Sequence, residues 1–76
     1  MRFLVILNAN SPIGTIYAGG SNDGFVRGQH PVLDCVEVTT DQPHYLFAKR
    51  DMSKRGGTSQ SLYIPHSSVW QSTATP

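Results

Sequence analysis

Glycine and proline recur so regularly along the chain that long helices have little room. From residue 14 to residue 65 the longer segments that they leave have about ten residues, a spacing typical of short strands joined by turns. The composition agrees, because Val, Ile, Thr and the aromatic residues, which suit a pleated sheet, make up 23 of the 76 residues. Alanine, the best helix former, occurs at only four positions. We therefore predict an all-β fold with little or no helix.

The apolar patterns between the turns locate the expected strands. Residues 2–7 are expected to form the first strand, and its continuous apolar run indicates burial on both faces or a contact between subunits. Further strands are expected at residues 13–18, 25–27, 32–40, 44–50, 61–64 and 67–71, with 25–27 as a short edge strand. In the strand at 32–40, Val36 and Val38 are expected on one face and Glu37 and Thr39 on the other.

Strands this short favour a small, strongly bent antiparallel sheet or barrel of five or six strands, of the Sm or SH3 kind. Closure of such a sheet hides the edges that an open sheet must protect. Residues 1–71 are expected to form one small β domain. Residues 72–76 contain a single alanine as their only apolar residue and are expected to fray as a C-terminal tail.

The core of so short a chain needs additional support. A domain of this size buries only about 60% of the surface that its unfolded chain exposes. Cys35 is the only cysteine, so no disulfide can form within the chain, and we expect it to be a small buried hydrophobic residue. Self-association into a homo-oligomer is the support that we expect.

No segment has the pattern of a targeting or membrane-spanning sequence. The apolar run that follows Arg2 ends at Asn8 after five residues, whereas a signal peptide needs about 7 to 15 apolar residues. No stretch approaches the roughly 20 apolar residues of a membrane span. We expect a cytoplasmic protein that does not associate with membranes.

The residue pattern predicts no enzyme, metal site or cofactor. Cys35 and the three histidines could supply a nucleophile and a base, but they form no recognised local signature. His30, His44 and His66 stand 14 and 22 residues apart, unlike the closely paired ligands of zinc sites. Residues 14–20 have the glycine spacing of a phosphate-binding P-loop, but Ser21 stands where that loop requires lysine.

A net charge of +1 conceals one basic segment. Seven consecutive residues carry +3, whereas the rest of the chain carries −2; the charged residues of the segment are Lys49, Arg50, Asp51, Lys54 and Arg55. Gly56 and Gly57 follow, and glycine lets backbone amides approach an anion. Two interpretations stay open: a loop that binds an anion, and a hairpin loop whose charges keep it in water.

Four aromatic residues flank this basic segment in the sequence: Tyr45, Phe47, Tyr63 and Trp70. Small barrels that bind nucleic acid combine basic residues with exposed aromatic rings on which bases stack. Aromatic residues of a small domain are more often part of its core. The sequence leaves open whether Tyr63 and Trp70 are exposed.

Residues 36–42 read as a bent strand, residues 45–49 as an apolar return strand, and residues 60–69 as the segment after a variable loop. Within the last segment, Tyr63, His66 and Val69 match positions of a Tyr-Lys-His-Ala-Ile motif, with Ile64 at the lysine position and Pro65 as an additional residue. In these features the second half of the chain resembles an Sm-like barrel of the Hfq type. The resemblance implies a ring of subunits that binds RNA at a subunit junction, with His66 at an RNA-contacting position.

These observations lead to one main hypothesis and two others. The main hypothesis is a non-enzymatic, oligomeric module that binds RNA or a phosphate-bearing nucleotide through Lys49, Arg50, Lys54, Arg55, Gly56, Gly57, Tyr63, His66 and Trp70. The alternative is a protein-interaction or inhibitory module, as small phage-encoded proteins often are, which binds a host protein through a strand edge or an aromatic patch. An enzyme would require His66 or Cys35 to be essential.

Overall fold

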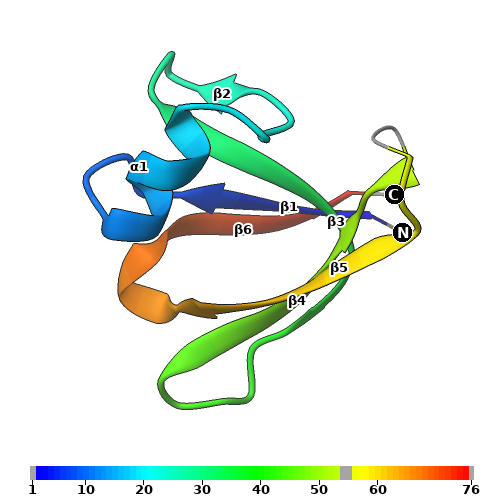
Figure 1. Ribbon diagram of the computed structural model, residues 1–76. Coiled ribbons are helices and arrows are strands. Elements are labelled where there is room, and N and C mark those ends of the chain that lie inside the picture. The colour runs from blue at the N-terminus through cyan, green and yellow to red at the C-terminus, as the bar shows by residue number, and fades with distance from the viewer. Residues whose placement is uncertain (1, 54–55, 76) are drawn as a thin grey trace.

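The computed structural model describes residues 2–53 and 56–75, which form an antiparallel sheet of six strands and one short α-helix. In chain order the elements are β1 (Arg2–Leu7), α1 (Pro12–Ala18), β2 (Phe25–Val26), β3 (His30–Thr39), β4 (Tyr45–Asp51), β5 (Ser59–Pro65), the 3-10 helix η2 (His66–Ser68) and β6 (Val69–Thr75) (Figure 1). The predicted small all-β fold is confirmed. The strand expected at residues 2–7 coincides with β1.

Strand β3 joins the two halves of the sheet. The strand order is β5-β4-β3-β1-β6, and β2 pairs with β3 outside this path. Residues 32–35 of β3 pair with β1, whereas its residues 35–39 pair with β4. The register shifts between Cys35 and Glu37, and a bulge of this kind bends a strand. Figure 1 accordingly shows β1 and β6 on one side of the molecule, and β4 and β5 on the other.

The bulge changes the alternation that the sequence predicts for β3. Val36 and Val38 were expected on the same face, but Val36 is 42% exposed while Val38 packs against the core. An extra residue in one strand of a pair leaves one side chain out of the regular alternation. The expectation was therefore wrong for Val36, which lies at the point where the register shifts.

One hydrophobic cluster unites the sheet. Its fully buried members come from β1, β3, β4 and β5: Val5, Leu7, Leu33, Cys35, Leu46, Ala48 and Ile64. Cys35 is completely buried, as expected for a small hydrophobic residue. Burial raises the pKa of its thiol to about 11, because the charged thiolate would lose its hydration there.

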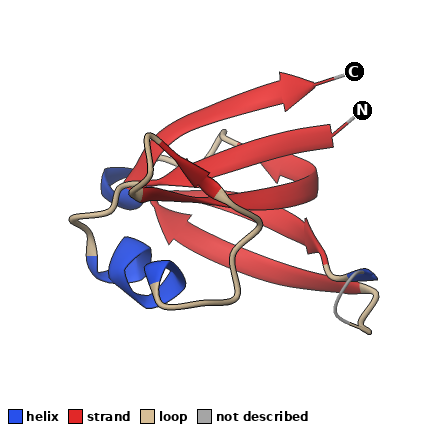
Figure 2. Ribbon diagram, turned by 90° about the horizontal axis from the view of Figure 1, so that it is seen from above, coloured by secondary structure: helices blue, strands red, loops and turns tan. Residues whose placement is uncertain are grey.

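The segment at residues 13–18 is helical, which corrects the predicted strand. Ser11 caps α1, since its hydroxyl accepts a hydrogen bond from the Gly14 N–H at 3.0 Å, and Pro12 occupies the first turn, where a missing N–H costs nothing. Ile13 and Tyr17 lie four residues apart on one helix face and pack against the core. Figure 2 shows α1 outside the sheet, near one of its ends.

The C-terminal segment is also more ordered than predicted. Residues 72–76 were expected to fray, but β6 runs to Thr75 and pairs with β1 from Leu7↔Val69 to Arg2↔Thr75. The pairing satisfies the backbone hydrogen-bonding groups on the second edge of β1. These hydrogen bonds stabilise β6 as a strand although its side chains are mostly polar. Figure 2 shows the start of β1 and the end of β6 side by side, in agreement with this register.

Candidate ligand-binding site

Strand β4 separates core side chains from surface side chains with a period of two. Leu46, Ala48 and Arg50 are buried, whereas Tyr45, Phe47 and Lys49 alternate with them and face the other side of the sheet. The sequence alone predicts the same alternation, because in a strand at residues 44–50 every second residue faces the same side. It also shows that Lys49 and Arg50, although adjacent, cannot act on the same side of the sheet.

Pairing with the neighbouring strands gathers aromatic side chains on this outer face. In the sheet register Phe47 lies directly opposite Tyr63 of β5 and opposite Thr39 of β3. The centre of the Tyr63 ring lies 5.2 Å from that of Phe47 and 5.3 Å from that of Tyr45, with an edge-to-face geometry in the second pair. Tyr63 is 65% exposed, so its ring is accessible to a ligand rather than part of the core.

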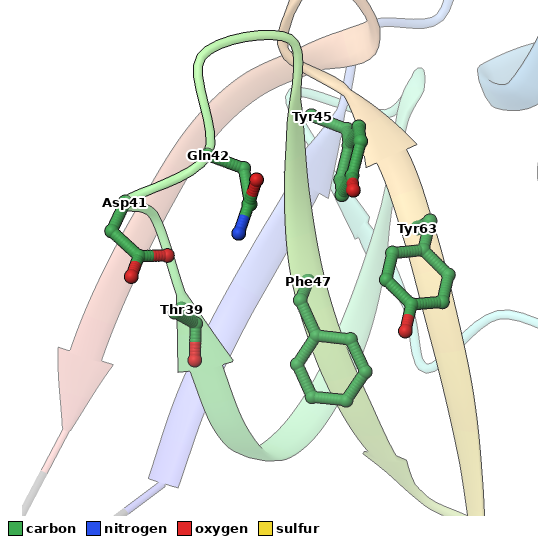
Figure 3. A pocket seen from close by; sticks show the side chains of 6 residues that line it. All are labelled: Thr39, Asp41, Gln42, Tyr45, Phe47 and Tyr63. Carbon is green, nitrogen blue, oxygen red and sulfur yellow. The ribbon is translucent and has the colours of Figure 1, made fainter.

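These rings form one side of an open pocket of about 370 Å³. The other side consists of polar residues from the end of β3 and the turn that follows it. The described residues that line the pocket are Thr39, Asp41, Gln42, Tyr45, Phe47 and Tyr63. Figure 3 shows the polar side chains on the β3 side and the aromatic ones on β4 and β5. No described residue hydrogen-bonds the side chains of Asp41 or Gln42, so both can bond to a ligand.

His66 holds the turn that carries these polar residues. Its Nε2 lies 2.8 Å from the backbone carbonyl oxygen of Gln42, and because a carbonyl only accepts, Nε2 carries the proton and donates. Its backbone N–H donates to the carbonyl of His44 at 3.3 Å. His66, predicted as a ligand-binding residue, does not line the pocket but ties the turn at residues 40–44 to the end of β5.

The electrostatics of the pocket differ from the basic site expected from the sequence. Asp41 is the only charged residue among the described residues that line it. Lys49 follows Phe47 by two residues on the same face of β4, which puts their Cα atoms about 7 Å apart. Lys49 lies opposite Glu37 in the register, but its ammonium group forms no ion pair with any described residue. It therefore stays available for an anion beside the pocket.

Arg50 cannot bind a ligand at the surface, which corrects another sequence prediction. Its side chain is fully buried, and its guanidinium pairs with Asp23 at an Nη2–Oδ2 distance of 3.2 Å. The guanidinium carbon also lies 5.7 Å from the centre of the Tyr17 ring of α1. Arg50 shares the core face with Leu46 and Ala48, so its position in the alternation of β4 already indicated that its side chain is buried.

The described part of the glycine loop includes Gly56 and Gly57, whose backbone amides bond within the chain. Lys54 and Arg55 lie outside the described residues. The Gly57 N–H donates to the Met52 carbonyl at 3.0 Å, and the Gly56 N–H points to the Ser53 carbonyl at 3.4 Å. Gly56 has a φ of +84°, a conformation that other residues adopt at a cost, so this glycine serves the turn itself. Both amides are thus engaged within the loop.

Trp70 belongs to a separate aromatic group on β6. Its ring stacks on His30 with 4.7 Å between ring centres and 8° between the planes, and the Arg27 guanidinium lies 5.7 Å from the Trp70 ring centre. The Nδ1 atom of His30 accepts a hydrogen bond from the Ala9 N–H at 3.1 Å, which fixes the imidazole. Trp70 is 39% exposed but does not line the pocket, so it is not part of the same site.

Sequence reasoning therefore identified one pocket residue, Tyr63, and missed the other five as ligand-binding residues. For Tyr45 and Phe47 a signal was present, because both alternate with the apolar residues that occupy the core. Thr39, Asp41 and Gln42 carried no such signal, since only the fold of the turn brings them to the aromatic side chains. Among the described residues, no group of three His, Cys, Asp or Glu side chains could hold a metal ion.

Comparisons with models of known protein families, with curated proteins and with solved structures find no match to this chain. Within residues 2–53 and 56–75, no helix is long and apolar enough to cross a membrane.

Proposed function

We propose that this protein is a non-enzymatic binding module whose pocket takes an unpaired base of RNA or of a free nucleotide. The observation that carries the proposal is the group of three aromatic side chains on the outer face of β4 and β5, with polar groups on the opposite side of the same pocket. Aromatic rings bind bases by stacking, and polar side chains read the hydrogen-bonding edge of a base that is not paired.

The size of the pocket supports a small planar ligand. Sites for small molecules usually measure about 300 to 1,000 Å³, and 370 Å³ lies near the lower limit. A single base would lie against Phe47 or Tyr63 with its edge toward Asp41 and Gln42. The pocket is open to solvent, so a base that belongs to a longer strand can enter without being released from its neighbours.

The charges around the pocket suggest the direction of the phosphate. Asp41 repels an anion, whereas Lys49 attracts one, and the two lie at different ends of the aromatic group along β4. A nucleotide would therefore place its base at the Asp41 end and its phosphate toward Lys49. This arrangement keeps the nucleotide hypothesis but transfers its main contacts from the basic loop to the outer face of the sheet.

A binding titration with matched variants tests the proposal. The probe is a fluorescein-labelled, single-stranded RNA of mixed sequence, followed by fluorescence polarisation. Loss of a stacked ring costs about 1 to 3 kcal/mol per base, so Tyr63→Ala should weaken binding about 5- to 150-fold. Phe25→Ala is the matched control, because Phe25 is also an exposed aromatic residue, at 48%, but does not line the pocket.

Two further measurements define the result. Lys49→Gln should weaken RNA binding and reduce its dependence on salt, because a phosphate contact releases counterions. If wild-type protein shows no saturable binding of the RNA at about 100 μM, or if Tyr63→Ala binds as well as Phe25→Ala does, the pocket is not a base-binding site and the proposal fails.

A protein partner is the second candidate, and the sheet edges favour it. In the described part of the chain β5 pairs only with β4, and β6 only with β1, so each presents one unpaired edge. An unpaired edge can accept a strand from a host protein, as expected of an inhibitory module, or from a second copy of this chain. We propose homo-oligomerisation on the same ground. Light scattering that finds a monomer at micromolar concentration would contradict it.

A further inference from the structure

From the polar side of the pocket we infer that the site selects guanine among the four RNA bases. The inference rests on the proposed function, since it names the base that the same pocket takes. The hydrogen-bond donors and acceptors of the pocket determine which base fits. A carboxylate, Asp41, lies beside an amide, Gln42, and a hydroxyl, Thr39, and within residues 2–53 and 56–75 no basic side chain lines the pocket.

A carboxylate only accepts hydrogen bonds, and it can accept two in parallel through its two oxygens. Guanine is the one RNA base whose pairing edge has two neighbouring donors, at N1 and at the N2 amino group. Adenine and cytosine have one donor next to an acceptor, and uracil has one donor between two carbonyl oxygens. Asp41 can therefore form two charge-assisted hydrogen bonds only with guanine, whereas it repels an acceptor of each other base.

Gln42 can complete the recognition of the same edge. Beside N1, guanine has the carbonyl oxygen O6, which accepts a hydrogen bond, and the amide NH₂ of Gln42 is a suitable donor. Figure 3 shows the side chains of Asp41 and Gln42 next to each other on the turn after β3. The bond from His66 Nε2 to the Gln42 carbonyl restrains the backbone at this point, which reduces the freedom that the turn would lose on binding.

The pocket also explains why the base, and not the phosphate, would provide selectivity. Lys49 contacts a phosphate in the same way whatever the base, so it contributes affinity without discrimination. Of the described lining residues Asp41 is the charged one. Because Asp41 is exposed, its carboxylate can keep part of its hydration when a base binds. Discrimination by such an exposed group should be about tenfold rather than a thousandfold.

The experiment is a calorimetric titration with mononucleotides that differ in their base. GMP should bind about tenfold more tightly than AMP or UMP. IMP lacks the N2 amino group and should bind more weakly than GMP, and XMP, which has a carbonyl at that position, should bind more weakly still. Asp41→Asn should reduce the preference for GMP over AMP to within about twofold, because the amide replaces one acceptor by a donor.

Control variants separate selectivity from folding and from charge. Glu37→Gln removes an exposed carboxylate of β3 that does not line the pocket, and it should leave the preference for GMP unchanged. Tyr63→Ala should weaken GMP and AMP by the same factor, since stacking serves every base. Circular dichroism of each variant verifies that the sheet is formed.

The outcomes distinguish this inference from the proposed function. If GMP and AMP bind equally well and both depend on Tyr63, the pocket binds bases without selecting guanine, and only the inference is overturned. If no mononucleotide and no RNA binds with dependence on Tyr63, both fail. A peptide rich in arginine presents similar paired donors to Asp41; if such a peptide binds in the pocket more tightly than GMP and independently of Lys49, the site belongs to a protein partner and both are overturned.

Discussion

The ion pair between the buried Arg50 and the partly accessible Asp23 leads to the most specific prediction about stability. Asp23 Oδ2 accepts hydrogen bonds from Arg50 Nη2 at 3.2 Å, from Arg50 Nε at 3.3 Å and from the Asp34 N–H at 2.8 Å. The Arg50 side chain is fully buried, and its Nη1 atom has no hydrogen-bond partner among the described residues. Asp23 is thus the carboxylate that compensates a guanidinium in the core.

The two ends of this pair should differ in what their removal costs. Asp23→Asn keeps the shape of the side chain but leaves the Arg50 charge buried without compensation, which costs about 3 to 5 kcal/mol in comparable cases. Arg50→Met removes the charge and the unpartnered Nη1 together and retains much of the apolar volume. Since Asp23 has partial access to water, with 16% of its side chain exposed, we expect Arg50→Met to cost no more than about 1 kcal/mol.

Urea denaturation at a fixed protein concentration measures this difference, with Trp70 fluorescence as the signal. A chain of 76 residues has a free energy of unfolding of about 4 to 11 kcal/mol. With a wild-type value in the upper part of this range, both variants still fold in the absence of urea. With a slope of about 1 kcal/mol per M, Asp23→Asn should lower the midpoint by about 3 to 5 M and Arg50→Met by no more than about 1 M. The double variant should resemble Arg50→Met, because it contains no uncompensated guanidinium.

A matched control and a clear contrary result complete the test. Asp41→Asn also replaces an aspartate by asparagine, but at an exposed site without an ion pair among the described residues, and it should change stability by less than about 0.5 kcal/mol. If Asp23→Asn and Arg50→Met destabilise the protein equally, or if the double variant is less stable than Asp23→Asn, then an uncompensated buried charge is not the cause of the effect.

Three further predictions follow from single sites. Gly14→Ala should destabilise the protein by about 1 to 3 kcal/mol in thermal melts although alanine favours helices, because the added Cβ would lie within 2 Å of a backbone oxygen. Gly19→Ala is the control and should be nearly neutral, since its Cβ would lie 3.6 Å from the nearest atom. Arg2 holds the pKa of Asp51 well below its ordinary value of 3.8, so this pair stabilises the fold above about pH 4 and the effect is lost as the pH falls; urea midpoints of Arg2→Met should therefore decline less steeply with acid than those of wild type. Cys35 should react with a thiol reagent at about pH 8 only as fast as the protein opens, and reaction at the rate of a free thiol in native protein would contradict its burial.

Much of the fold could be predicted from the local pattern of apolar residues in the sequence. Apolar runs and alternation located β1, β4 and β5, because a strand with one buried face repeats every two residues. The same reasoning failed for α1, where Ser11 and Pro12 are a helix start signal that the β-branched residues after them outweighed in the prediction. It failed for β6 as well, since the polar sequence of that strand does not show that β1 has an edge to pair with.

The candidate site, like the fold, could be predicted only in part from the sequence. The outward direction of Tyr45 and Phe47 follows from their alternation with Leu46 and Ala48, so the sequence by itself determined that β4 presents aromatic rings away from the core. It did not determine which residues face those rings. That choice depends on the register of β3 with β4 and on the turn at residues 40–44, which are set by contacts between residues far apart in the chain.

Arg50 illustrates the difference most directly. A cluster of basic residues in the sequence suggests a charged surface, because isolated charges are expensive to bury. Only the tertiary structure brings Asp23, 27 positions earlier, within hydrogen-bond distance and so makes burial of Arg50 tolerable. The sequence thus determined the class of fold and the face on which each β4 side chain lies, because these depend on local periodicity. Which charges are compensated, and which polar groups meet the aromatic rings, was decided by long-range packing.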